Sequence, residues 1–274
     1  MRQHPPILRL IARRRLRFIA QSCAGVVLLA SWQTWNGQAG TIEDQAAWED
    51  LVGLRSREAL EKFREASGGA AVLGEALALL NLPPRSEATV EKADQLLARA
   101  AEDPVVAAEA EYYRARILQI HRPVPDLTAA KAAYAALITK FPDSAFGQMA
   151  VVKWALITAA QARKADREAV YREIEAKGAG LSNLDAARDF HLLLANTSAR
   201  WEMPPERSLA ELRAAEKTGT LSGRIAGDVL VRIGELSNLL GSREDALAAY
   251  TEFVRLFPRD RRTFTLRQQM AEKP

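Results

Sequence analysis

The chain has 274 residues, 48% of them hydrophobic, and Ala, Leu, Glu and Arg, all good helix formers, are abundant. Its formal charge of +4 would suit a nucleic-acid binder, but six arginines lie within the first seventeen residues. The rest of the chain has 32 basic and 34 acidic residues, so the charge distribution argues against nucleic acid as a partner.

The N-terminal segment resembles an export signal. A basic stretch ends at Arg17, residues 18–32 are mostly apolar, and a polar segment follows up to Gly40. These are the three parts of a secretory signal, with a cleavage site after Ala39. The alternative is an uncleaved anchor in the inner membrane, although fifteen residues form a helix of only ~22 Å against a hydrocarbon core of ~30 Å. We therefore expect residues 1–39 to be a signal peptide or anchor, and 40–274 to be an exported domain.

Cys23 is the only cysteine, and the most apolar residues of the leader follow it. A lipidated cysteine would stand after that apolar run, so we do not expect lipidation. Removal of the leader leaves a chain without cysteine, which excludes disulfides, thiol nucleophiles and Cys-ligated zinc from the mature domain.

Two segments of the remaining chain are similar to each other. Each has a small residue, an aromatic residue four positions later, and Phe-Pro seven and eight positions after the aromatic residue. The segments are Ala130, Tyr134 and Phe141-Pro142, and Ala246, Tyr250 and Phe257-Pro258. Large residues recur in the same role at intervals of 34, 37, 37, 41 and 38, namely at Phe63, Leu97, Tyr134, Tyr171, Leu212 and Tyr250. Near-equal intervals of this length indicate a repeated pair of helices.

The helical pattern predicts six pairs of antiparallel helices and no sheet. In chain order, we expect helices over 42–54 and 56–67, 70–81 and 86–102, 104–120 and 127–141, 144–162 and 165–178, 182–200 and 204–218, and 221–240 and 242–257. A closing helix over 262–273 should cover the last pair with Phe264, Leu266 and Met270.

The last pair resembles the tetratricopeptide repeat. The residues that carry the resemblance are Leu230, Ile233, Gly234, Gly241, Ala246, Tyr250, Phe253 and Pro258. Their types suit their places, because small Gly234 and Ala246 permit close helix approach and Gly241 suits a left-handed turn. Ser242 is expected to cap the second helix, and Pro258 to end it. The resemblance implies an all-α, tetratricopeptide-like superhelical solenoid, and the Phe-Pro-Asp-Ser at 141–144 is similar to repeats of bacterial envelope proteins.

No residue pattern predicts catalysis, a cofactor or a metal. His121 and His191 have no second histidine or acid at ligand spacing, and the glycine-rich stretch at 67–74 lacks the Lys-Ser/Thr of a phosphate loop. We expect Trp154 to lie in the core. Trp201, before the Pro204-Pro205 turn, suits either the core or an exposed anchor.

The family resemblance also implies where a partner binds, because first helices line the inner surface of such solenoids. The candidate partner contacts are Tyr112, Tyr113, Phe146, Met149 and Trp201. We therefore expect a non-catalytic scaffold in the cell envelope that binds partner peptides or helices, such as envelope-assembly or cell-wall components. One alternative is a membrane-anchored assembly factor with its repeats in the periplasm. Another, of a different class, is an enzyme built on a helical toroid.

Export can be tested directly on the N-terminus. Mass spectrometry of the protein from its native envelope is expected to find an N-terminus near Gly40, because signal peptidase would cut after Ala39. An intact Met1 in the membrane fraction would support the anchor instead. An intact Met1 in a soluble cytoplasmic fraction would refute export.

Overall fold

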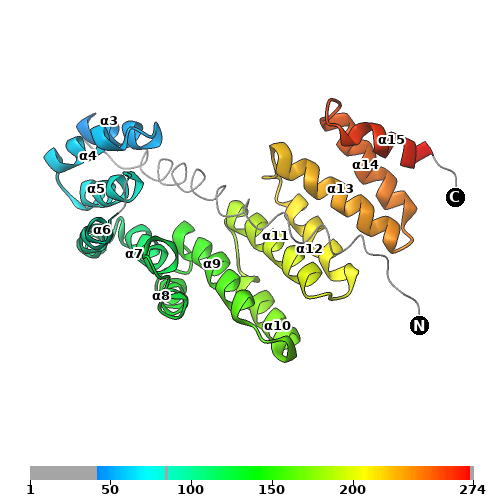
Figure 1. The fold of residues 1–274 in the computed structure, drawn as a ribbon, viewed down its shortest axis with the longest axis horizontal. Coiled ribbons are helices and arrows are strands. Elements are labelled where there is room, and N and C mark those ends of the chain that lie inside the picture. The colour runs from blue at the N-terminus through cyan, green and yellow to red at the C-terminus, as the bar shows by residue number, and fades with distance from the viewer. Residues whose placement is uncertain (1–41, 84–85, 272–274) are drawn as a thin grey trace. The chain divides into compact units, whose positions relative to one another are not determined.

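The computed structural model describes residues 42–83 and 86–271, in which helices are joined by turns and loops and no strand occurs (Figure 1). Thirteen α-helices lie in these ranges, each within a few residues of its predicted position. They form six successive pairs followed by one closing helix. The predicted leader, residues 1–39, lies outside the described part of the chain. Among the described helices, none is long and apolar enough to cross a membrane.

The chain packs as two compact units, Met1–Gly147 and Gln148–Pro274. Within the first, each helix packs against the next along the chain from α3 to α8. The helices are α3 (Ile42–Val52), α4 (Ser56–Glu65), α5 (Gly69–Asn81), α6 (Glu87–Ala100), α7 (Ala107–Arg116) and α8 (Leu127–Lys140). A five-residue π-helix, η1 (Ile117–His121), extends α7, and α9 (Ala145–Gln161) begins at the end of this unit.

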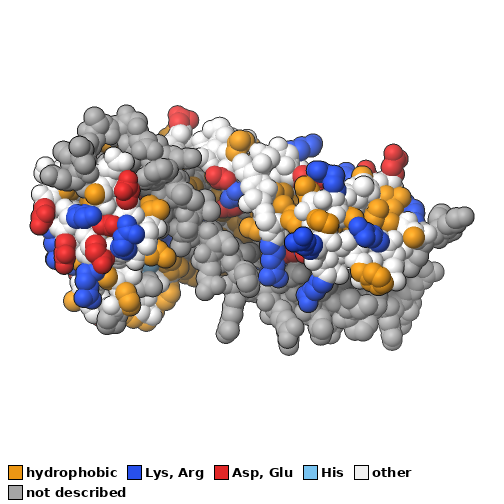
Figure 2. Space-filling model, turned by 90° about the horizontal axis from the view of Figure 1, so that it is seen from above, with side chains coloured by type: hydrophobic (Ala, Val, Ile, Leu, Met, Phe, Trp, Pro, Cys, Tyr) orange, Lys and Arg blue, Asp and Glu red, His pale blue; other side chains and the backbone are white. Residues whose placement is uncertain are grey.

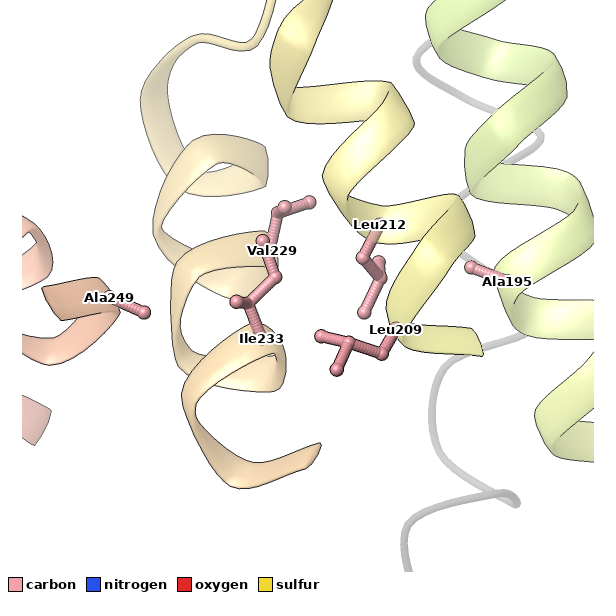
Figure 3. Packing of buried hydrophobic residues seen from close by; sticks show 6 residues of the cluster. All are labelled: Ala195, Leu209, Leu212, Val229, Ile233 and Ala249. Atoms are coloured by element: carbon pink, nitrogen blue, oxygen red, sulfur yellow. The ribbon is translucent and has the colours of Figure 1, made fainter. Parts of the chain in front are cut away.

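The second unit contains the rest of α9, its partner α10, the last two pairs and the closing helix. Its helices are η2 (Lys164–Asp166), α10 (Arg167–Gly178), α11 (Leu184–Arg200), α12 (Pro205–Lys217), α13 (Gly223–Leu239), α14 (Arg243–Leu256) and α15 (Arg262–Ala271). Figure 3 shows part of the core, in which Leu209 and Leu212 of α12 face Val229 and Ile233 of α13. This core continues from pair to pair, because the second helix of one pair contacts the first helix of the next.

Helix pairs approach closely where a glycine faces an aromatic ring. A Cβ atom on Gly234 of α13 would overlap the ring of Tyr250 in α14. The same relation holds for Gly74 with Phe63, and for Gly178 with Phe190. Tyr250 is almost completely buried, as the repeat pattern predicts. The small residue therefore provides the space that the large one fills.

The Phe-Pro turn is built in the same way in both copies of the repeat. Phe141 and Phe257 cap α8 and α14 with nearly equal backbone angles, φ −133° and ψ 56° against φ −125° and ψ 55°. Each Phe carbonyl accepts a hydrogen bond from the amide three residues later, at 3.2 Å from Ser144 and 3.0 Å from Asp260. The sequence similarity between the two segments thus corresponds to one local structure used twice.

Two expectations about the last pair were wrong in detail. Phe264 is 70% exposed, whereas Leu266 and Met270 pack on the pair as expected. Two residues correspond to about 200° around a helix, so Phe264 lies on the opposite side of α15 from Leu266. Ser242 occupies the N-cap of α14, but its hydroxyl donates to the Asp245 carboxylate at 2.7 Å and caps no backbone amide.

The glycine–aromatic contact is testable by adding one methyl group. Gly234→Ala is expected to lower the free energy of unfolding by about 1–3 kcal/mol, because the new Cβ must displace the buried Tyr250 ring. Gly180→Ala is the matched control, since a Cβ there meets no atom within 4 Å. Urea unfolding of both variants measures the difference, and equal effects would show that the contact does not limit helix approach.

Candidate protein-binding site

A cluster of aromatic side chains holds α7, α8 and the start of α9 together. Tyr112 lies at its centre, with ring centroids 5.7 Å from Tyr113, 5.9 Å from Tyr134 and 5.6 Å from Phe146. All four are buried, and Tyr112 has no exposed surface. The sequence predicts Tyr112, Tyr113 and Phe146 as partner contacts. The structure does bring them together, but as the core of a helix pair, with almost no surface left to offer a partner.

The other two candidate contacts lie in the second unit. Trp201 follows α11 and is buried under the Arg167 guanidinium, whose carbon is 5.5 Å from the ring centroid. Of the two alternatives for Trp201, a core position and an exposed anchor, the structure therefore shows the core position. Trp154 is buried as expected, and only Met149 of the five candidates keeps partial exposure.

Arg116 lies at the edge of the aromatic cluster and was not recognised from the sequence. Its guanidinium carbon is 5.9 Å from the centre of the Tyr112 ring, and the residue is partly buried. Burial lowers the pKa of Arg116, but Tyr112 and Tyr134 raise it, and the net shift is upward. The charge is therefore retained, and the groups that act on it most strongly include no carboxylate. A basic residue on a helix is normally assigned to the solvated face, which is why the sequence alone did not distinguish it.

The end of α7 departs from α-helical geometry directly after Arg116. The π-helix η1 places Gln119 where its side-chain oxygen accepts a 2.8 Å hydrogen bond from the Tyr134 hydroxyl. Burial raises the pKa of that hydroxyl, so it remains a neutral donor. Single π-helical turns inside α-helices often occur at functional sites. Here the turn joins a buried polar group to an exposed loop.

That loop carries an exposed apolar patch, made up of Ile120, Val124 and Leu127, which we call the loop patch. Val124 is 80% exposed, and all three residues are more than a third exposed. Backbone hydrogen bonds from Arg122 to Ile117 at 3.2 Å and from Asp126 to Leu118 at 2.9 Å fix the loop against η1. The prolines at 123 and 125 signalled a loop but not this exposure. The loop patch and Arg116 thus belong to one short segment.

A polar network connects the second helices of the second unit. Arg207 of α12 donates two hydrogen bonds to Glu168 of α10, at 2.7 and 2.8 Å, and stacks 5.3 Å from the Tyr171 ring centroid. His191 of α11 lies 2.7 Å from a Glu211 oxygen. The two parallel hydrogen bonds of the arginine–carboxylate pair join α10 and α12 directly.

Among residues 42–83 and 86–271, no group of three or more His, Cys, Asp or Glu side chains is arranged to hold a metal ion. On the face seen in Figure 2, basic and acidic side chains are interspersed and hydrophobic side chains form small separate patches.

No protein-family model matches the sequence, and no curated protein matches it either. Among solved structures, the chain is similar to PilW, described as a widely conserved type IV pilus biogenesis factor. The match has a TM-score of 0.53 and 17% identity, and it covers 83% of this chain and 99% of that one. With the succession of helix pairs, this likeness shows an all-α, tetratricopeptide-like repeat fold. At this identity it shows the fold alone.

The hydrogen bond inside the site is expected to stabilise its unit measurably. Tyr134→Phe removes the 2.8 Å bond to Gln119 and should cost about 0.5–1.5 kcal/mol in the free energy of unfolding. Tyr250→Phe is the matched control, because its hydroxyl takes part only in a long 3.4 Å bond from Asn238. Urea midpoints compare the two, and an equal loss would show that the Gln119 bond contributes nothing specific.

Proposed function

We propose that the protein is a non-catalytic scaffold of the cell envelope that binds other proteins through its helical repeats. The observation that carries the proposal is the repeat fold itself, since stacked helix pairs present a row of helix faces to a partner. Arg116 and the loop patch provide recognisable contact features on that framework. Partner peptides or helices are the ligands that such surfaces suit.

The envelope location is supported by two independent observations. The arginine-rich start, short apolar segment and small residues before Gly40 have the composition of an export signal. The similar fold of PilW, a type IV pilus biogenesis factor, agrees with a place in envelope assembly. We infer that the protein assists the assembly of a surface structure such as a pilus. Both the cleaved and the membrane-anchored forms are compatible with this role.

The scaffold is favoured over an enzyme on a helical toroid. An enzyme of that kind would need acid and base groups converging in one place. The nearest approach to this among the described residues is the network of Glu168, Arg207, His191 and Glu211. Its strongest interactions are ion pairs between neighbouring helices, which suit a structural role. The fold likeness to a biogenesis factor points the same way.

Site-specific photocrosslinking in cells tests the proposed function. A photoreactive residue at Val124 in the exposed loop patch is expected to capture a defined envelope protein, with the full chain and its leader in place. The control position is Glu61, an exposed residue on α4 away from the loop. Capture of the same proteins at both positions, or of cytoplasmic proteins only, would contradict an envelope scaffold with a defined binding surface.

A further inference from the structure

The outer face of the closing helix α15 carries an exposed aromatic side chain. Phe264 is 70% exposed, whereas every other phenylalanine, tyrosine and tryptophan of the described residues is buried or half-buried. Leu266 and Met270, on the inner face of the same helix, pack on the core of the last pair. The inner face therefore closes the repeat without help from Phe264, and the ring is left at the surface.

Arginines without ion pairs accompany this ring. Residues 257–271 contain four arginines and a single acid, Asp260. Arg262 binds Asp260 through hydrogen bonds of 2.8 and 3.0 Å and also pairs with Asp228. Hydrogen bonding from Arg262 is the main cause of the low pKa of Asp260, and Arg261 contributes the smallest effect. Three exposed arginines thus form no ion pair with the described residues, namely Arg259, Arg261 and Arg267.

Two of these arginines lie close to Phe264 along the chain. Arg267 follows it by three residues and Gln268 by four, and residues at these spacings are neighbours on a helix surface. Arg261 precedes Phe264 by three residues and stands directly before the first residue of α15. The set of Arg261, Phe264, Arg267 and Gln268, which we call the α15 face, therefore combines one apolar ring with two unpaired positive charges. Aromatic side chains and arginine are the residue types enriched in protein interfaces.

The charge of the α15 face selects among the molecules that could cover it. A second copy of the chain using the same face would bring arginines against arginines, and like charges facing each other are unfavourable. Anionic lipids would attract the arginines, but a single ring is a small apolar anchor, since even a myristoyl chain alone binds membranes only marginally. An acidic protein segment with apolar residues satisfies both the charge and the ring.

We propose that the α15 face is a docking surface for an acidic amphipathic segment of a partner protein. This rests on the proposed function, and it adds a surface in the second unit to the loop patch of the first. Apolar side chains of the partner would cover the Phe264 ring, and its Asp or Glu side chains would pair with Arg261 and Arg267. A guanidinium binds a carboxylate through two parallel hydrogen bonds, which fixes the orientation of the segment.

Stability measurements on the full chain separate a contact residue from a structural one. Phe264→Ala is expected to leave the unfolding midpoint unchanged or to raise it slightly, because the ring lies outside the core and Ala is the better helix former. Leu266→Ala on the same helix is the comparison, and it should lower the midpoint because Leu266 is buried. If both variants lower the midpoint equally, Phe264 is structural and the proposal is wrong.

Photocrosslinking in cells from Gln268, which is exposed, tests the docking itself. The captured protein, mapped by mass spectrometry, is expected to carry Asp or Glu next to apolar residues at the crosslinked position. Phe264→Ala should lower capture about tenfold or more, because the ring is no longer buried on binding. Arg267→Gln should lower it about twofold to fivefold. Arg255→Gln is the matched control and should retain capture, because Arg255 is an exposed arginine already paired with Glu252.

The other occupants of the α15 face give different results in these experiments. Crosslinks to a second copy of the chain, to phospholipid, or to a protein segment without acidic residues would overturn the proposal. Undiminished capture in Phe264→Ala would do the same. With the purified chain, Phe264-dependent binding to phosphatidylglycerol vesicles would show that the face meets a lipid surface instead of a protein.

The two photoreactive positions separate this inference from the proposed function. Capture of an envelope protein at Val124, without Phe264-dependent capture at Gln268, would leave the scaffold standing and remove the α15 face from it. Phe264-dependent capture at Gln268 alone would support the α15 face and remove the loop patch. Capture at neither position would reject both the scaffold and the α15 face.

Discussion

The packing of an aromatic ring against a glycine on the neighbouring helix is the contact on which the rest of the structure depends. Gly234 with Tyr250, Gly74 with Phe63 and Gly178 with Phe190 each bring two helices to a distance that any larger residue would prevent. Protein interiors are close-packed, so this distance also sets which side chains can meet at the flanks of each contact. Between α12 and α13 no such contact is present among the described glycines, and Leu209, Leu212, Val229 and Ile233 fill the space between the helices instead.

The two clearest copies of the repeat share the same buried residues and the same turn. Tyr134 and Tyr250 are buried in equivalent places, and the Phe-Pro turns that follow them have the same geometry. Where the third pair departs from the other copies, with a π-helix and a longer loop, it has an exposed apolar patch.

Several arginines of the chain form ion pairs with carboxylates on neighbouring elements. Arg207 with Glu168 and Arg262 with Asp260 join neighbouring elements, and hydrogen bonding from Arg262 lowers the pKa of Asp260 to about 2. Arg116 is also partly buried, but it lies against the Tyr112 ring and forms no ion pair with a carboxylate of the described residues.

The sequence by itself determined the helices and their order, because helix periodicity, proline positions and the interval between large residues are local or regular properties. The pairing of Tyr250 with Gly234 was also predictable, since both belong to one repeat pattern. What only the tertiary structure decided is which face of each helix is covered. Aromatic residues are common at binding surfaces, but neighbouring helices bury four of the candidates, Tyr112, Tyr113, Phe146 and Trp201. Phe264 is of a residue type typical of cores, but the orientation of α15 about its axis leaves it exposed. The contact of Arg116 with the Tyr112 ring was also visible only in the structure, because residue spacing does not encode three-dimensional surroundings.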